Sequence, residues 1–344
     1  MLYDLFRSML FQLPAELSHD MALWALKNGG QYFIPSVLTP SQHLNPVKIA
    51  NLHFPNKIGL AAGLDKQATC IPAWQKMGFG FIELGTVTPQ PQAGNAKPRL
   101  FRYLEDKAII NRFGFNSCGI DQFLENLSRF VKNQKKCLWG INIGKNKHTD
   151  NNLAYQDYCL CLEKAYFLAD YITVNISSPN TQDLRSLQEP DNLSKLLDKI
   201  LTTRLKLEQE YAKYVPLFIK ISPDLTDSDL KSILNILMSR KIDAVITTNT
   251  TIWRPAVQTS QKNAEAFYAQ SGGLSGNPLF DLSLGCLKKC ADITSGNLPI
   301  IASGGIDSVA AAKLKLAAGA TLVQIYSGLI YHGPKLVREL ITEL

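Results

Sequence analysis

The stretch PIIASGGIDSVAAAKLKLAAGATLVQIYSG, residues 299–328, alternates two kinds of segment. Its apolar runs at 299–305 and 322–328 are typical of strands that are covered on both faces, as in a parallel sheet. Residues 307–320 between them predict a helix, and a parallel strand pair needs a crossover of this kind. The stretch therefore predicts one strand–helix–strand unit of a parallel sheet.

Similar apolar runs precede this unit at residues 57–65, 81–87, 138–144, 171–177, 217–222 and 244–249. Helical stretches separate several of them, including 226–240, where Thr226 and Asp227 stand near the expected start. Eight strands alternating with helices predict an α/β fold, a (β/α)8 TIM barrel over residues 41–344. Long inserts at 88–137 and 250–280 are expected to be loops over one face of the barrel. A doubly wound sheet is the alternative, but GLAAGLDK at 59–66 lacks the G-x-G-x-x-G fingerprint that it would need.

Composition narrows the function classes. The chain has 344 residues, of which 46% are hydrophobic and 19% charged, so a large core is expected. The net charge of +7 is scattered and forms no Lys/Arg block with interleaved aromatic residues, which argues against a nucleic-acid partner. Seven cysteines without a C-x-x-C motif predict reduced thiols in a cytoplasmic protein, and no histidine spacing indicates a metal site.

Residues 1–40 are predicted to be a separate amphipathic helical segment and linker. Two apolar stripes recur near helical spacing: Leu2, Leu5, Phe6, Met9 and Leu13, then Leu17, Met21, Trp24 and Ala25. Such helices suit a membrane interface that admits an apolar ligand, and no uncharged run reaches the roughly 18 residues of a spanning helix. A lid on the barrel or a dimer contact is the alternative.

Polar or small residues stand at the carboxyl ends of the expected strands: Lys66, Thr86, Asn142, Asn175, Ser178, Lys220, Thr248, Asn249, Gly304, Gly305, Tyr326 and Ser327. Barrel active sites are assembled at that face, so a site is predicted there, although any single member could be an ordinary strand cap. Lys66 and Lys220 interrupt apolar surroundings and predict an anionic ligand, with Asp65 as an alternative partner of Lys66.

Small residues at 303–305 and 326–328 leave backbone N–H groups bare just before a helix, which is typical of a phosphate site in barrels. From these residues alone, a non-catalytic barrel that binds a phosphorylated ligand remains an alternative to an enzyme.

A series of motifs, in order from about residue 46 to 330, carries a family resemblance: GLAAGLDK, GTVTPQPQAGNAKPRLFR, NRFGFN, INIGKNK, NISSPNT, KISPDL, TTNTT, GGLSG, SGGIDS and QIYSGLI. Together they resemble dihydroorotate dehydrogenase, most closely the quinone-dependent, membrane-associated branch. The resemblance implies an FMN-containing barrel that oxidises dihydroorotate to orotate in pyrimidine biosynthesis. It also implies a peripheral location on the cytoplasmic side of a cell membrane; the oligomeric state stays open, with a monomer as the working expectation.

The resemblance implies three groups of site residues. Those for FMN are Ala62, Gly63, Leu64, Asp65, Lys66, Thr86, Asn142, Asn175, Lys220, Thr248, Gly276, Gly305, Tyr326 and Ser327. Those for orotate are Lys66, Asn111, Arg112, Phe113, Gly114, Phe115, Asn175, Asn180, Asn249 and Thr250. Those near a quinone path are His19, Arg102 and Tyr326.

The stretch NISSPNTQDL, residues 175–184, contains the catalytic base that the resemblance implies, Ser178. No histidine, cysteine or carboxylate stands among its first seven residues, and serine needs activation, so a proton relay through Thr181 or a water is expected. A plain turn hydroxyl is the alternative. A related branch uses cysteine here, so Ser178 favours the quinone-dependent branch over a soluble enzyme using fumarate or NAD.

Overall fold

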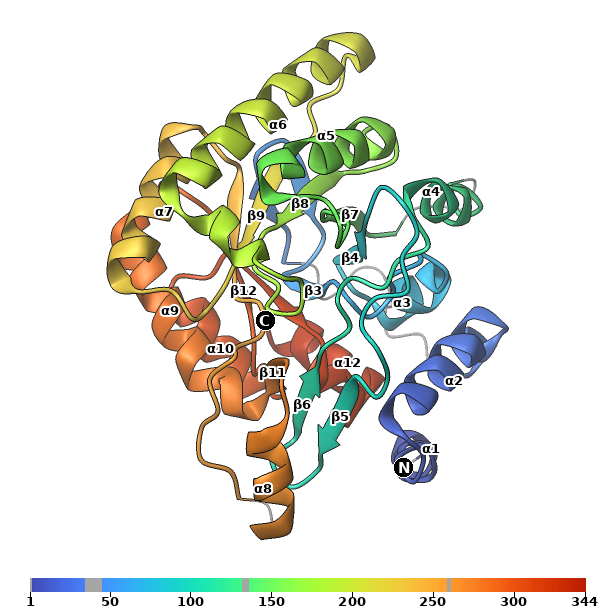
Figure 1. The fold of residues 1–344 in the computed structure, drawn as a ribbon. Coiled ribbons are helices and arrows are strands. Elements are labelled where there is room, and N and C mark those ends of the chain that lie inside the picture. Colours follow the sequence, from blue (N-terminus) through green and yellow to red (C-terminus); the bar gives the residue numbers. More distant parts are fainter. Residues whose placement is uncertain (1, 35–44, 132–135, 259–260) are drawn as a thin grey trace.

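The computed structural model describes residues 2–34, 45–131, 136–258 and 261–344, and a closed barrel of parallel strands stands at its centre (Figure 1). Its strands are β3 (Ile58–Leu60), β4 (Phe81–Val87), β7 (Leu138–Ile143), β8 (Tyr171–Asn175), β9 (Leu217–Ile221), β10 (Ala244–Thr247), β12 (Ile300–Ser303) and β13 (Leu322–Ile325). The barrel closes where β13 pairs with β3, Gln324 opposite Gly59. The predicted barrel and its eight strands are confirmed, although several strands are shorter than expected.

Helices surround the barrel: α3 (Ile71–Met77), α4 (Ile120–Ser128), α5 (Ala154–Ala165), α6 (Pro190–Tyr211), α7 (Asp227–Ser239), α9 (Phe280–Thr294), α10 (Val309–Ala317), α11 (Ser327–His332) and α12 (Pro334–Glu343). Two predicted helices are confirmed as α7 and α10, and each begins at a hydroxyl cap. The Thr226 side chain accepts from the Asp229 N–H, and the Ser308 side chain accepts from the Ala311 N–H, both at 3.2 Å.

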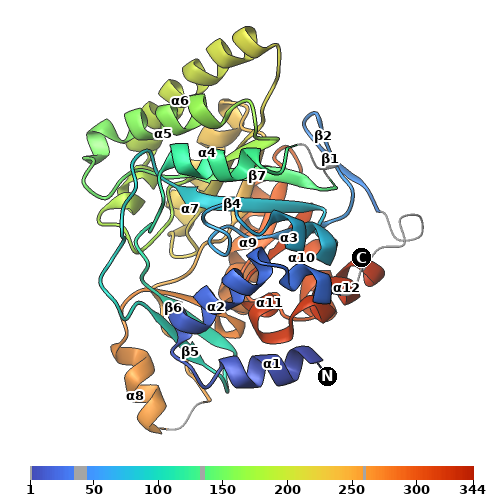
Figure 2. The ribbon, with the colours of Figure 1, turned by 90° about the vertical axis from the view of Figure 1, so that its right-hand side faces the viewer.

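A hairpin that the sequence analysis did not predict closes the amino end of the barrel. It is formed by β1 (Val47–Ile49) and β2 (Leu52–Phe54), and Figure 2 shows it at the end opposite to the loops that follow the strands. Ile49 and Phe54 pack against Phe81, Tyr171 and other side chains from the starts of the strands. The site must therefore lie at the other, carboxyl end.

The two long inserts at 88–137 and 250–280, expected to be loops, contain a second sheet. Its antiparallel strands are β5 (Leu100–Tyr103), β6 (Ala108–Asn111) and β11 (Gly273–Gly276), in the order β11–β6–β5, with α8 (Gln261–Ala269) beside it. Ile110 and Leu274 form a small core with Phe267 of α8. The expectation of loops is corrected, because strands from distant inserts satisfy one another's backbone groups.

The N-terminal extension is helical, as predicted, with α1 (Leu2–Leu10), α2 (Ala15–Lys27) and the 3-10 turn η1 (Gly30–Phe33). It lies against β5 and α11 (Figure 2): the Tyr3 hydroxyl donates to the Ile330 carbonyl at 2.7 Å, and Arg102 donates to the Leu13 carbonyl at 2.6 Å. The predicted division at residues 40–41 lies outside the described residues. No helix among those described is both long and apolar enough to cross a bilayer.

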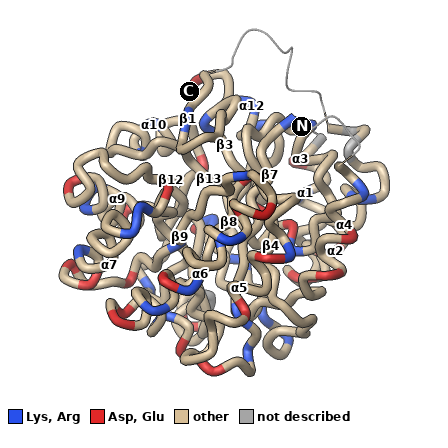
Figure 3. Tube along the Cα trace, turned by 90° about the horizontal axis from the view of Figure 1, so that it is seen from above, with Lys and Arg blue, Asp and Glu red and all other residues tan. Residues whose placement is uncertain are grey.

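The outer face of this extension stays apolar. Leu5, Met9 and Trp24 are 65%, 66% and 69% exposed, whereas the Ser18 side chain is buried and donates to the Leu10 carbonyl at 2.6 Å. Figure 3 shows lysine, arginine, aspartate and glutamate interspersed around the molecule. The extension therefore packs on the barrel through its inner face, as the lid interpretation predicts, while apolar side chains on its outer face are exposed among the described residues.

Candidate active site

A cavity of about 1110 Å³, its open mouth included, lies at the carboxyl end of the barrel. The structure brings most predicted site residues into its wall: Ala62, Gly63, Lys66, Thr86, Asn111, Phe113, Gly114, Phe115, Asn175, Ser178, Asn180, Lys220, Thr248, Asn249, Thr250, Gly276, Gly305, Tyr326 and Ser327. Residues expected at the ends of different strands therefore surround one common cavity.

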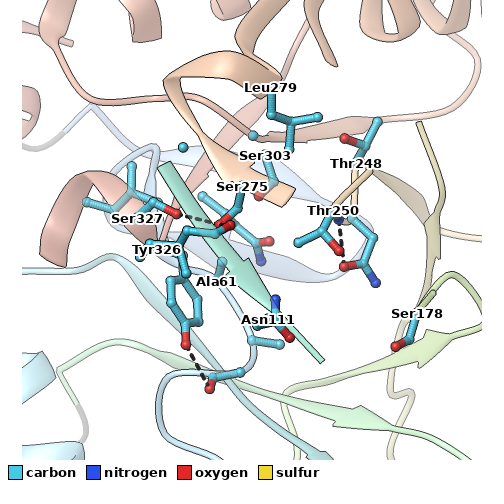
Figure 4. A pocket seen from close by; sticks show the side chains of 18 of the residues that line it. Ala61, Asn111, Ser178, Thr248, Thr250, Ser275, Leu279, Ser303, Tyr326 and Ser327 are labelled. Atoms are coloured by element: carbon cyan, nitrogen blue, oxygen red, sulfur yellow. Dashed lines mark hydrogen bonds between the residues drawn. The ribbon is translucent and has the colours of Figure 1, made fainter. Parts of the chain in front are cut away.

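The cavity has two chemically different sides. Figure 4 shows Ser178 on one side, with Asn111 between it and Tyr326 and Ser327 on the other. Ser275 and Ser327 pair their hydroxyls at 2.9 Å, and the glycines at 304, 305 and 328 line the wall beside them. The asparagine side suits a ligand with amide edges, and the glycine side suits an anion held by backbone N–H groups.

Glu83, which the sequence analysis missed, organises the floor of the cavity. Its carboxylate is fully buried inside the barrel and accepts hydrogen bonds from three side chains: Asn142 Nδ2 at 2.7 Å, Gln324 Nε2 at 2.8 Å and Thr173 Oγ1 at 3.1 Å. These partners come from β7, β13 and β8. The signal was available, because a charged residue interrupts the apolar run FIELGTV.

Lys220 projects from β9 into the same floor, and its Nζ lies 4.0 Å from Glu83 Oε1. This carboxylate is not apparent beside Lys220 in the sequence, since Glu83 is 137 positions away but adjacent across the barrel. Burial lowers the pKa of Lys220, and the charge of Glu83 opposes that shift. Lys220 therefore faces the cavity as part of a charged pair and needs no ligand to balance it.

Asn142 is predicted to touch the cofactor, but it does not line the cavity. Its Oδ1 accepts from Thr86 Oγ1 at 2.5 Å and from Asn175 Nδ2 at 3.2 Å, while its Nδ2 is bound to Glu83. Thr86 and Asn175 do line the cavity. Asn142 thus orients two wall residues from behind.

Ser178 follows β8 and its side chain is almost fully buried, at 6% exposed. Its Oγ accepts from the Asn180 backbone N–H at 3.2 Å, the arrangement of a serine turn. In the described part of the chain, the buried Thr181 Oγ1 has no hydrogen-bond partner. Both hydroxyls expected in the relay are thus present, without a direct hydrogen bond between them.

Amide side chains from the end of β6 and from the loops that follow β8 and β10 meet near Ser178. Asn180 Nδ2 donates to Asn111 Oδ1 at 3.1 Å, and Asn249 Nδ2 donates to Ser177 Oγ at 3.0 Å. The Asn180 Oδ1 is buried and has no hydrogen-bond partner among the described residues, although Asn180 lines the cavity. Buried polar atoms are normally satisfied, which indicates that a ligand donates to this oxygen.

Arg185, another residue that the sequence analysis did not single out, ties two of these loops together. Its guanidinium donates to the Ser177 carbonyl at 3.1 Å, to the Thr250 carbonyl at 3.0 Å and to Asp224 Oδ2 at 2.8 Å. Asp224 in turn accepts from the Ile252 N–H at 3.0 Å. The Arg185 guanidinium therefore fixes the positions of the loops that follow β8 and β10 relative to each other.

Lys66 lies over the Phe113 ring, 3.5 Å from its centroid. Desolvation by burial lowers the pKa of Lys66 to about 7, with a smaller contribution from the charge of Arg99. Asp65 is not its partner: its carboxylate accepts from the Thr69 and Cys70 N–H groups at 2.9 and 2.8 Å, at the start of α3. Lys66 is thus available to an anionic ligand.

The side chains of three more predicted residues do not line the first cavity. Leu64 packs in the main hydrophobic core, and Asp65 is taken up at α3. Arg112 points to the outer surface, where it donates to the Pro98 carbonyl at 2.8 Å and to Gln270 Oε1 at 2.8 Å. The structure therefore does not bring these side chains together with the others.

A second cavity separates α2 from the barrel and is lined by His19, Trp24, Lys66 and Phe113, among others. The His19 ring lies 6.3 Å from the Phe113 ring, and burial, followed by the charge of Lys66, lowers the pKa of His19 to about 4. Phe113 and Lys66 line both cavities, so the second one adjoins the first.

The other two residues of the predicted quinone path are not in the second cavity. Arg102 lies over the Phe11 ring at 4.3 Å and donates to the backbone of the turn between α1 and α2. The Tyr326 hydroxyl donates to the Gly63 carbonyl at 3.3 Å inside the first cavity. The three side chains therefore mark different places: the second cavity, the helical extension and the first cavity.

Fold and site together define a (β/α)8 barrel with a ligand cavity at the carboxyl ends of its strands, extended by a helical cap. The family model for dihydroorotate dehydrogenase matches residues 45–344, and the chain belongs to that family. It is 50% identical to a Haemophilus influenzae protein named dihydroorotate dehydrogenase (quinone) and 48% identical to one from Vibrio vulnificus, with each chain covered completely.

A solved structure extends the likeness to three dimensions. The chain is similar to DHODH from Eimeria tenella in complex with ferulenol, with a TM-score of 0.87 and 39% identity. The match covers 95% of this chain and 90% of that one. The likeness in three dimensions therefore spans nearly the whole chain.

Proposed function

We propose that this protein oxidises dihydroorotate to orotate in pyrimidine biosynthesis, with FMN as cofactor and a membrane quinone as the electron acceptor. The observation that carries the proposal is the cavity itself, because one wall gathers Ser178 and amide side chains while the other gathers glycine loops. Membership of the family supports the reaction, and the names of the bacterial relatives support the choice of quinone.

The residues present fit FMN. Thr248 Oγ1 and Gln324 Oε1 line the cavity, are buried and lack partners among the described residues, so they are free to bind a ligand. Lys220 lines the cavity whereas its partner Glu83 does not, so the positive end of this pair would face the ring and favour an electron-rich form of it. The holders would be Ala62, Gly63, Lys66, Thr86, Asn175, Lys220, Thr248, Gly276, Gly305, Tyr326 and Ser327. When bound, FMN supplies the acceptor for a hydride.

The asparagine side of the cavity fits orotate, a planar anion with amide-like edges. Asn111, Asn180 and Asn249 each offer a donor and an acceptor, and Lys66 would face the carboxylate. Ser178 would take the proton that lies α to a carbonyl, and Thr181 or a water would pass it on. Phe113, Gly114 and Phe115 would enclose the substrate beside Lys66.

Quinone would enter by way of the helical extension. The second cavity opens between α2 and the barrel, next to Lys66 and Phe113 of the first. The exposed Leu5, Met9 and Trp24 would lie in the membrane interface, which supports peripheral attachment. The cytoplasmic side and the monomer rest on the family resemblance alone.

Two measurements test the proposal. Denatured protein should release FMN in a 1:1 ratio, and dihydroorotate turnover should be supported by a quinone analogue in preference to fumarate or NAD. Recovery of FAD would refute the cofactor assignment. Colourless protein that cannot be reconstituted with FMN would favour the alternative, a barrel that only binds a phosphorylated ligand.

A further inference from the structure

Lys315 is a lysine with no solvent contact. It belongs to α10, is 0% exposed, and its Nζ donates to Ser283 Oγ on α9 at 2.5 Å. The ammonium also lies 5.0 Å from the centre of the Phe280 ring. Within the described residues, Lys315 has no carboxylate in ion-pair contact. A buried ammonium without a counter-charge is costly, so its retention needs an explanation.

Ser283 connects this ammonium to the glycine loop of the cavity. Its Oγ lies 3.0 Å from the Gly304 carbonyl oxygen and 2.9 Å from the carbonyl of Phe280. Gly304 has φ 106°, and a Cβ there would come within 3.0 Å of the Ser283 side chain. Only glycine therefore lets the loop approach α9 closely enough for this contact.

The Gly304 carbonyl fixes the direction of the next N–H group. In a trans peptide the C=O and the following N–H point in opposite directions, so the Gly305 N–H is directed away from Ser283. It has no hydrogen-bond acceptor among the described residues, and Gly304 and Gly305 both line the cavity. A free donor is thus presented to a ligand, with a buried positive charge behind it.

We propose that Lys315 and Ser283 act as positioning residues for the phosphate group of the flavin: they orient the Gly304–Gly305 peptide and place a buried positive charge behind it. The inference rests on the FMN proposal above and adds two residues outside the cavity wall. A phosphate dianion would supply the counter-charge that Lys315 lacks among the described residues.

Electrostatics agrees with this role. Burial lowers the pKa of Lys315 to about 7, while Cys286 and Asp281 on the facing helix act in the opposite direction. A dianion bound to the loop would favour the charged form of Lys315, so phosphate binding and protonation of this lysine reinforce one another.

The test compares FMN with riboflavin, which carries the same ring system without the phosphate. Apoprotein is titrated with each flavin, and the quenching of flavin fluorescence gives the dissociation constant. In Lys315→Met we expect FMN binding to weaken by about tenfold or more, the scale of one lost charge-assisted contact, while riboflavin binding changes less than about twofold. Ser283→Ala should shift FMN binding in the same direction.

A control and a stability readout separate this role from simple helix packing. Lys313→Met changes a lysine on the same helix that is about half exposed and pairs with Glu343, and it should leave both constants unchanged. The Lys315→Met apoprotein should melt no lower than the parent, because a buried charge has been removed.

The outcomes are distinct. Equal loss of FMN and riboflavin affinity, or no loss of either, overturns the role of Lys315 while leaving FMN binding by the parent intact. A Lys315→Met apoprotein that melts far below the parent also overturns it, because the role of Lys315 is then helix packing. In that case Ser283→Ala should leave the dissociation constant for FMN unchanged. A parent chain that binds no FMN refutes the proposed function and this inference together.

Discussion

Ser178 accepts one hydrogen bond, from the Asn180 N–H, and so keeps a lone pair for the substrate proton. We predict that Ser178→Ala retains flavin and orotate binding but slows flavin reduction by dihydroorotate about 10²-fold or more, the usual scale of a lost general base. Single-turnover absorbance at the flavin band measures this rate. Ser178→Cys should recover part of it, because a thiol also accepts a proton, and an unchanged rate in the alanine variant removes Ser178 from the mechanism.

The protonation state of Lys66 should make the affinity for an anionic ligand depend on pH. Its pKa in the folded apoprotein is about 7, below the ordinary 10.5, so the side chain is charged below pH 7 and neutral above it. An anionic ligand pairs with the charged form, and we predict that the affinity for orotate falls as the pH rises from 6 to 9, by up to about tenfold per unit. Isothermal titration over that range tests it.

A matched variant isolates this effect. Lys66→Met should bind orotate weakly at every pH, with a flat profile between 6 and 9. If the falling profile persists in Lys66→Met, the titrating group is another residue.

At the scale of elements, the helical extension separates the two half-reactions. Its exposed apolar side chains are expected to enter lipid at about 25 cal/mol per Å² buried. We predict that Met9→Gln with Trp24→Gln weakens binding to lipid vesicles and slows turnover with a long-chain quinone, while flavin reduction by dihydroorotate stays at the parent rate. Vesicle sedimentation and single-turnover reduction provide the two measurements.

Leu205→Gln is the control, since Leu205 is exposed on α6 and far along the chain from the extension. It should not alter vesicle binding. If the Met9 and Trp24 changes leave both vesicle binding and long-chain quinone turnover intact, the extension is only a lid.

Deleting the N-terminal extension removes an ion pair with the barrel as well as the exposed apolar side chains. Arg99 is buried and donates to Glu16 of α2 at 2.9 Å, as well as to the carbonyls of Ala93 and Asn95. A chain starting near Pro40 should still be reduced by dihydroorotate and lose long-chain quinone turnover. Because Glu16 is lost, its melting temperature should also fall, and restoring neutrality with Arg99→Met should recover part of that loss.

At the scale of the whole molecule, the barrel interior is filled by aromatic rings at its closed end. A Cβ on Gly140 would lie 2.0 Å from the Tyr171 ring, whereas one on Gly285, in helix α9, meets nothing within 4 Å. We predict that Gly140→Ala lowers the free energy of unfolding by at least about 1–3 kcal/mol, the cost of overpacking. Gly285→Ala should raise it by up to about 1 kcal/mol through helix propensity.

Thermal and denaturant unfolding of both variants and of the parent measures these changes in the free energy of unfolding. The two changes add the same methyl group, so opposite signs would reflect the clash at Gly140 and the gain in helix propensity at Gly285. If Gly140→Ala is as stable as the parent, the interior is looser than its geometry indicates.

The sequence by itself determined the barrel, its eight strands and many of the residues in the cavity wall. Strand and helix periodicities are local, and the rule that parallel strands present their carboxyl ends to one face converts them into a site. Lys66, Ser178 and Asn249 were found in this way, and the motif resemblance added the loop that carries Asn111.

Only the tertiary structure decided which polar groups meet one another. Glu83 joins side chains from β7, β8, β9 and β13, Arg185 bridges two loops, and Lys315 reaches the glycine loop through Ser283. The sheet of β5, β6 and β11 pairs segments that are about 160 residues apart. Local sequence cannot predict such contacts, because the stability of each group depends on a partner that chain topology alone brings within hydrogen-bonding distance.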